Sequence, residues 1–173
     1  MYYMKKAYII LTAIIAAIVA AQFTGCGNQA KPAEDLKEML TAQVLEFETF
    51  LDDSIKPIST AKDKALLVNK FRTLRNKYKT FEWAVEYYMP SIARFVNGPP
   101  LPEVEQPEIV VLEPHGLQVM EEMVLEESVD FDALNEEIVL LKSYCISIKE
   151  NIQTAGFTQP QLYDALKKEV FRV

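Results

Sequence analysis

The sequence contains few of the residues that catalytic and metal-binding motifs require. Its 173 residues include one histidine, two cysteines and five glycines. It has no Cys-x-x-Cys-His segment for covalent haem attachment, no glycine-rich phosphate loop, no His-Glu-x-x-His helix and no Gly-x-Ser-x-Gly turn. One of the two cysteines, Cys26, lies in a predicted lipidation motif described below. The remaining cysteine and the single histidine cannot form a conventional four-ligand zinc site. The sequence by itself therefore does not point to a chemical reaction.

The lone histidine and the internal cysteine are both expected to be structural. His115 lies between Pro114 and Gly116, where a short helix is predicted to begin, and a local hydrogen bond is favoured there over a role as metal or haem ligand. Cys145 lies on an apolar helical stripe. Because no histidine pairs with it in the sequence, a buried thiol is favoured over a nucleophile.

Acidic residues outnumber basic ones. The chain has 25 Asp and Glu against 18 Lys and Arg, which gives a formal net charge of −7. This charge disfavours nucleic acid and anionic lipid as partners. Half of the residues are hydrophobic, which suits one well-packed domain, since single domains usually contain roughly 100 to 200 residues.

The N-terminal segment has the organisation of a secretion signal. Lys5 and Lys6 precede an apolar run from Ala7 to Ala21, which is short for a membrane span of about 20 residues. The segment Phe23-Thr24-Gly25-Cys26 resembles a bacterial lipobox, with phenylalanine where leucine is usual. The resemblance implies that residues 1–25 are a lipoprotein signal peptide and that Cys26 is lipidated. An uncleaved helical anchor and an ordinary signal peptide are the alternatives.

The lipidated chain is expected on the periplasmic face of the cell envelope. Gly27 stands where an aspartate would signal retention in the inner membrane, so the outer membrane is favoured. Residues 26–33 are predicted to be a tether and residues 34–173 a helical domain. With Cys26 acylated, Cys145 has no cysteine to pair with, and no internal disulfide is expected.

Two long apolar stripes predict the main helices. Spacings of three and four residues are typical of helices that pack nearly parallel or antiparallel to their neighbours. The first stripe follows a Thr60-x-x-Asp63 capping pattern and ends at a kink at Met89, and the second starts at Asp130 or Asp132. Their members are Phe71, Leu74, Tyr78, Phe81, Val85 and Tyr88 in the first, and Phe131, Leu134, Ile138, Leu141, Cys145, Ile148, Ile152 and Ala155 in the second.

Shorter patterns predict the remaining elements. A first helix is expected from Glu34 to about Asp53, with Pro57 at its end or in the following turn. Short helices are expected over 91–96 and 116–125. After Gly156 as terminator, a Thr158-x-x-Gln161 capping box is expected to start a last helix, 160–171, that buries Leu162, Leu166 and Val170.

The segment Asn97–Pro114 is too rich in proline for a helix. We expect an ordered crossover loop there, with a short extended piece at most over 109–112. The predicted fold is all-α: an antiparallel, up-and-down bundle of about four main helices with a proline-rich crossover loop.

A row of charged residues runs beside the first stripe, one residue after its apolar positions. Basic residues occupy the first half of the row and acidic residues the second: Arg72, Arg75, Lys79, Glu82 and Glu86. Three interpretations remain open, namely a solvated face, a structural polar network against a neighbouring helix, and a ligand or metal pocket.

The segment Gly116-x-Gln118-x-x-Glu121 resembles the Gly-x-His-x-x-Glu motif of imelysin-like helical proteins, whose His and Glu are presumed metal ligands. Here Gln118 stands where histidine is expected. Glutamine is a poor ligand for transition metals, so the substitution argues against a metal site. Gln118 and Glu121 are instead candidates for hydrogen bonding to the charged row.

Several motifs together resemble the helical N-terminal region of bacterial dihaem cytochrome c peroxidases. They are Phe71-Arg72-x-x-Arg75-x-x-Tyr78-Lys79-x-x-Glu82, Glu86-Tyr87-Tyr88-x-Pro90, Asn97-Gly98-Pro99-Pro100-Leu101-Pro102 and Glu113-Pro114-x-Gly116-x-Gln118, with Val170 to Val173 resembling the passage toward the haem domains. In that family two covalent c haems in a downstream portion reduce peroxide. This chain has neither attachment motif, so no cofactor is expected in it.

The resemblance implies a truncated or separated accessory module rather than a catalyst. Its apolar last residue, Val173, without a helix terminator, favours a cut. The implied partner is a haem-containing peroxidase or an electron-transfer protein, together with the membrane through the lipid anchor. An imelysin-like periplasmic lipoprotein that binds a metal or haem is the alternative, and a structural lipoprotein without a ligand is a third interpretation.

Overall fold

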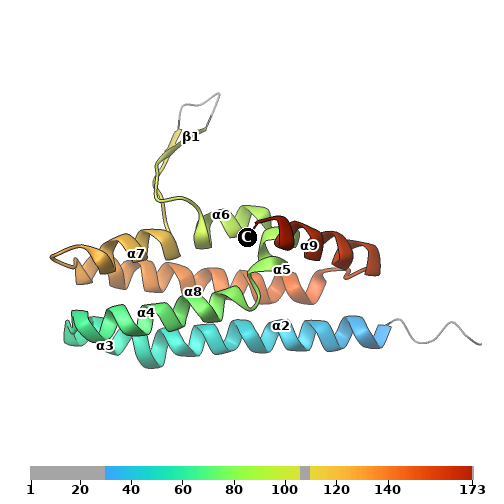
Figure 1. The fold of residues 1–173 in the computed structure, drawn as a ribbon, viewed down its shortest axis with the longest axis horizontal. Coiled ribbons are helices and arrows are strands. Elements are labelled where there is room, and N and C mark those ends of the chain that lie inside the picture. The colour runs from blue at the N-terminus through green and yellow to red at the C-terminus, as the bar shows by residue number, and fades with distance from the viewer. Residues whose placement is uncertain (1–29, 106–109, 173) are drawn as a thin grey trace, which may run out of the picture. The chain divides into compact units, whose positions relative to one another are not determined.

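The computed structural model describes residues 30–105 and 110–172. The chain divides into two compact units, Met1–Asp35 and Leu36–Val173, and every buried residue of the described part belongs to the second. The described residues are predominantly helical, which confirms the all-α class (Figure 1). The predicted signal peptide and the predicted lipidation site, Cys26, lie outside the described residues.

Eight α-helices, one π-helix and two short strands make up the described chain. The helices are α2 (Ala30–Phe50), α3 (Lys56–Ala61), α4 (Lys64–Lys79), α5 (Glu82–Tyr88), α6 (Pro90–Asn97), α7 (Leu117–Leu125), α8 (Phe131–Thr154) and α9 (Gln159–Arg172), with the π-helix η1 at Leu51–Ile55. The strands are β1 (Glu103–Glu105) and β2 (Val110–Leu112).

The first helix is longer than its pattern predicts. It begins at Ala30, inside the segment expected to be a tether, and continues through η1 into α3. The Lys56 N–H bonds to the Leu51 carbonyl five residues back, and Pro57 then occupies the first turn of α3. Because proline has no N–H to donate, the wider turn lets the chain remain helical past Pro57, and the predicted end there is wrong.

The cap of α4 is Asp63 alone. Its carboxylate accepts a hydrogen bond from the Leu66 N–H at 3.0 Å. Thr60 belongs to α3 and donates its hydroxyl to the Lys56 carbonyl at 2.9 Å, so the capping box expected from Thr60 and Asp63 is not formed. One acidic N-cap is sufficient to satisfy a free N–H of the first turn.

The helix predicted from the first apolar stripe, Phe71 to Tyr88, is interrupted once within the stripe and once just after it. The kink expected at Met89 is present, and Pro90 starts α6. A second interruption at Thr80 and Phe81 separates α4 from α5, with Phe81 at φ −123° and ψ 0°. Phe81 and Glu82 are both buried after this turn.

The proline-rich segment contains a pair of antiparallel strands, where an ordered crossover loop with at most one extended piece was expected. β1 and β2 pair antiparallel with Val104 opposite Val111, and the ribbon projects from the helices (Figure 1). The sequence predicted an extended piece at β2 but not the pairing strand β1. Residues 106–109 lie outside the described residues.

Polar pairs show that α2 and α8 run antiparallel. Lys149 pairs with Glu48 of α2, and Lys142 pairs with Asp52 of η1 at 2.7 Å, so later residues of α8 meet earlier residues of the α2–η1 segment. On the other side of α2, the rings of Phe47, Tyr78 and Phe81 pack together at centroid distances of 5.2 to 6.1 Å. These rings join α2 to the end of α4 in the core.

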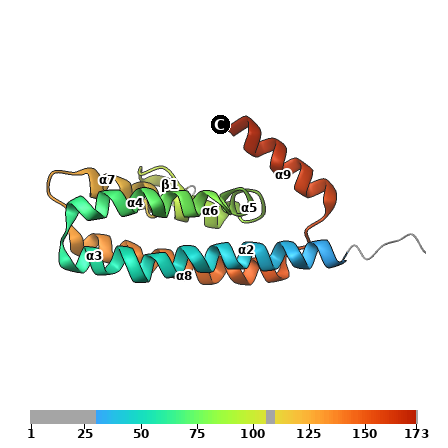
Figure 2. The same cartoon turned by 60° about the horizontal axis from the view of Figure 1, so that its bottom comes forward.

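Six residues of the α8 stripe, from Leu134 to Ile152, are buried as predicted, whereas Phe131 and Ala155 at its two ends are only half-buried. Asp130 caps the helix. The last helix differs. Thr158 and Gln161 make the expected hydrogen bonds, but Leu166 and Val170 are 54% and 72% exposed. Their predicted burial is wrong because α9 packs on α5 through Ala165 instead. Figure 2 shows α9 inclined to α8.

Gly156 does not end α8 in the left-handed conformation expected of a glycine terminator. Ala155 ends the helix with extended backbone, at φ −64° and ψ 136°. Within the described residues, no helix has both the length and the apolar character needed to cross a membrane.

Candidate functional site

A polar cluster forms around Asn97, at the C-terminal end of α6. The Asn97 amide nitrogen donates to Glu82 at 2.9 Å, and its side-chain oxygen accepts from Arg75. The Asn97 backbone carbonyl accepts from the Gln118 amide at 2.8 Å. One asparagine therefore connects α4, α5 and α7.

Two ion pairs extend this cluster. Lys79 lies 2.7 Å from Glu82, and Arg75 lies 3.7 Å from Glu121. Glu82 has no exposed surface, so its charge is stabilised by the lysine and by the asparagine amide. The residues brought together from the sequence candidates are Arg75, Lys79, Glu82, Gln118 and Glu121. This arrangement corresponds to the structural polar network.

Arg72 and Glu86 lie outside the cluster. Both are exposed, and Glu86 lines a pocket formed by residues of α5 and α9. Asn97 was missed as a member because only the tertiary fold brings it beside Glu82.

A second polar group anchors the start of α7. The carboxylate of Glu137 on α8 is bonded to His115 Nδ1 at 2.8 Å and accepts from the Gly116 N–H at 2.9 Å. Gly116 has φ +96°, and an added Cβ would lie 2.4 Å from the Phe95 and Val96 carbonyl oxygens. Only glycine fits this close approach of α7 to α6.

Glu137 was not singled out from the sequence. It precedes Ile138 and lies four residues before Leu141, within the buried side of α8. An acidic residue inside an apolar stripe was the available signal, since buried carboxylates require partners. His115 therefore has a hydrogen-bond partner on a distant helix rather than a local one.

Cys145 is buried in the α8 stripe. Burial raises the pKa of its thiol to about 12. At neutral pH the thiol remains protonated, and thiolate rather than thiol is the nucleophile. The environment of Cys145 thus suits a core residue.

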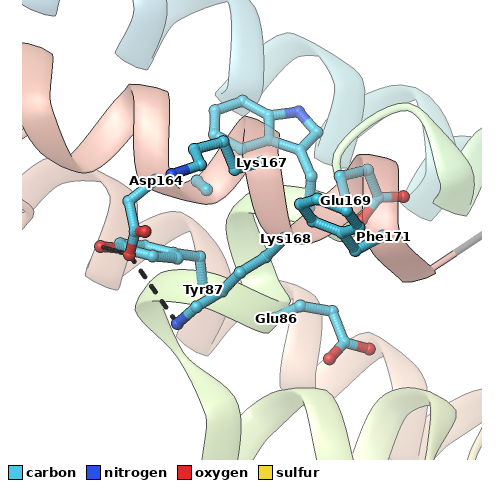
Figure 3. A pocket seen from close by; sticks show the side chains of 9 residues that line it. Glu86, Tyr87, Asp164, Lys167, Lys168, Glu169 and Phe171 are labelled. Atoms are coloured by element: carbon cyan, nitrogen blue, oxygen red, sulfur yellow. Dashed lines mark hydrogen bonds and ion pairs between the residues drawn. The ribbon is translucent and has the colours of Figure 1, made fainter.

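A pocket of about 470 Å³ lies between α5 and α9 (Figure 3). It is lined by aromatic, small and charged residues of both helices: Trp83, Glu86 and Tyr87 from α5, and Asp164, Ala165, Lys167, Lys168, Glu169 and Phe171 from α9. No sequence pattern indicates this pocket, because the pattern of α9 predicts that its apolar residues are buried against the main helices.

Asp164 connects the two walls of this pocket. The Tyr87 hydroxyl donates to its carboxylate at 3.0 Å, and the Lys168 ammonium lies 3.9 Å from the same carboxylate. The ammonium also lies 4.7 Å from the centre of the Tyr87 ring. The pKa of Tyr87 is raised mainly by its hydrogen bond to Asp164 and to a smaller extent by desolvation. These contacts hold α9 against α5.

The described residues contain no group of three or more His, Cys, Asp or Glu arranged to hold a metal ion. Gln118, at the position of the imelysin-like histidine, uses its amide to bond the Asn97 carbonyl. In comparisons of the whole chain, no family model, curated protein or solved structure matches it.

Proposed function

We propose that the chain is a lipid-anchored periplasmic helical module that docks on a haem-containing peroxidase or electron-transfer protein. In this proposal it is accessory rather than catalytic. The observation that carries the docking role is the exposed apolar face of α9, formed by Leu166 and Val170 with the neighbouring Phe171, which is 84% exposed. Apolar patches of this kind mark interaction surfaces.

The motif resemblance to the N-terminal region of dihaem cytochrome c peroxidases supports the choice of partner. In that family the segment matching Val170 to Val173 leads toward the haem domains. The exposed face of α9 lies in and just before this segment. A haem-bearing surface that covers α9 would account for both features.

An imelysin-like, up-and-down bundle is the architecture we assign to the module. The antiparallel course of α2 and α8 supports it, as do contacts of Lys64 and Arg75 along α4 with the end and middle of α7. The alternative function, metal or haem capture by an imelysin-like lipoprotein, has less support because Gln118 and Glu121 are engaged with Asn97 and Arg75.

Binding to a separately produced haem region tests the proposal. The ligand in a calorimetric titration would be the haem-bearing region of a dihaem cytochrome c peroxidase from the same organism, loaded with its haems. We expect saturable binding, and at least a tenfold weaker affinity for the Leu166→Glu variant, equivalent to about 1.4 kcal/mol.

Leu45→Glu is the matched control. Leu45 is 53% exposed, as Leu166 is 54% exposed, but it belongs to α2 rather than to α9. It should bind as the original chain does. Absence of binding at about 100 μM, equivalent to less than roughly 5.5 kcal/mol, would contradict the docking role. Strong haem staining of the purified chain would contradict its accessory, haem-free character.

A further inference from the structure

We infer that the pocket between α5 and α9 receives an uncharged aromatic side chain from the docked partner. This inference rests on the proposed docking function and names the chemistry of its central contact. The pocket opens beside the exposed residues of α9, since Phe171 both lines it and belongs to that exposed surface.

The size of the pocket fits such a group. Its volume of about 470 Å³ falls within the roughly 300 to 1,000 Å³ of pockets that enclose small organic ligands. One aromatic side chain would occupy part of this volume. Ala165, which is 2% exposed, lines the pocket with only a methyl group, so its side chain takes up little of the pocket volume.

The walls of the pocket are aromatic. Trp83 and Tyr87 come from α5, and Phe171 closes the end opposite Asp164 (Figure 3). Aromatic rings pack favourably on one another in offset and edge-to-face arrangements. The same protein already uses such pairs, since Tyr87 and Tyr88 meet edge to face at 4.8 Å.

The charges around the pocket do not select a charged ligand. Lys168 is paired with Asp164 and covers one face of Tyr87, so a ligand cation or carboxylate would have to displace a contact already made. The remaining charged residues that line the pocket carry both signs, namely Lys167, Glu86 and Glu169. An uncharged ring leaves these contacts intact.

An apolar pocket inside a charged rim is the arrangement of an interface hot spot. Such pockets hold one buried aromatic anchor, and the surrounding polar residues exclude water from it. The exposed apolar face of α9 would add contact area around this anchor. The pocket would fix where the partner sits on that face.

Trp83 allows this inference to be tested directly, because it is the only tryptophan of the chain and it lines the pocket. The full chain is titrated with N-acetyl-phenylalaninamide, N-acetyl-lysinamide and N-acetyl-alaninamide while the Trp83 emission is recorded. We expect a saturable blue shift with the phenylalanine probe alone, half complete on the order of millimolar, as befits a small fragment.

Phe171→Ala and Val170→Ala form the matched pair of variants. Both residues are exposed on α9, but only Phe171 lines the pocket. Phe171→Ala should weaken the phenylalanine probe several-fold, and Val170→Ala should leave it unchanged. Equal or tighter binding of the lysine probe, or no saturable change with any probe, would overturn the inference.

Titration of the same variants with the haem region separates this inference from the docking function. Loss of affinity in Phe171→Ala supports the anchor. Undiminished affinity of that variant overturns the anchor while the docking function stands. Binding of the phenylalanine probe without any binding of the haem region would overturn the partner assignment and retain a pocket for aromatic groups.

Discussion

Helices α8 and α9 carry similar apolar patterns but have opposite environments. In both, apolar residues recur at steps of three and four. In α8 the residues Leu134, Ile138 and Leu141 are buried, whereas in α9 Leu166 and Val170 are exposed. Periodicity predicts that a helix has an apolar face, but it does not specify which surface covers that face.

The neighbours of the two helices explain the difference. α8 packs against α3, α6 and α7 and forms ion pairs with α2. α9 packs on α5, where Ala165 is the buried contact and the Asp164 carboxylate bonds Tyr87. One side of α9 is thereby attached, and its larger apolar residues are left exposed.

The largest expected difference between the helices concerns stability. Leu141→Ala should lower the free energy of unfolding by about 2 to 5 kcal/mol, because it leaves a cavity in the core. Leu166→Ala should change it by no more than about 0.5 kcal/mol. Urea unfolding of both variants measures this contrast, and equal losses would mean that α9 is covered in the free chain.

The two glutamates at the ends of one turn of α5 extend the contrast. Glu82→Ala should cost about 1 to 3 kcal/mol, because it leaves the half-buried Asn97 amide without its carboxylate acceptor. Glu86→Ala, on the exposed side, should cost about 0.5 kcal/mol or less. Chemical denaturation is again the measurement, and a neutral Glu82→Ala would contradict the structural role of the cluster.

Substitutions of two glycines compare the space available at the start of α7 with the space available in the link between α8 and α9. Gly116→Ala should destabilise by more than about 1 kcal/mol, because its φ of +96° and the nearby carbonyls exclude a side chain. Gly156→Ala meets no atom within 4 Å and should be neutral or stabilising by up to about 1 kcal/mol. Thermal melting distinguishes them, and similar shifts would contradict the close approach of α7 to α6.

The smallest effect is expected at Cys145, which should not react with a thiol reagent in the folded chain between pH 7 and 9. Burial raises its pKa to about 12, so the thiol stays protonated over this range. Since the folded pKa exceeds the ordinary 9.0, folding is disfavoured as pH rises past that value. Rapid labelling without denaturant would show that the α8 stripe opens.

The sequence predicted the features that depend on residue spacing within one helix or on local capping chemistry. The α8 stripe, the break at Met89 and the hydrogen bonds between Thr158 and Gln161 follow from spacing and local chemistry, and the structure confirms them. The π-helix before Pro57, the turn at Phe81 and the pairing of β1 with β2 were not predicted. Each depends on contacts or backbone choices that a period of three or four residues does not encode.

The candidate residues show the same division. Arg75, Lys79 and Glu82 were found because they share a helical row, but Asn97 and Glu137 complete their groups from other elements. The pocket beside Trp83 was missed for the related reason that α9 was expected to face the core. Neighbours distant in sequence therefore decided which candidates came together.

Footprinting of α9 tests the central claim most directly. In the Leu166→Cys variant, the rate of thiol labelling at that position is measured with and without the haem region of the dihaem peroxidase, and buried Cys145 serves as the internal reference. We predict fast labelling in the free chain and at least tenfold slower labelling when the haem region is bound. Slow labelling of the free chain, or an unchanged rate with a saturating haem region, would contradict the assignment of α9 as the docking surface.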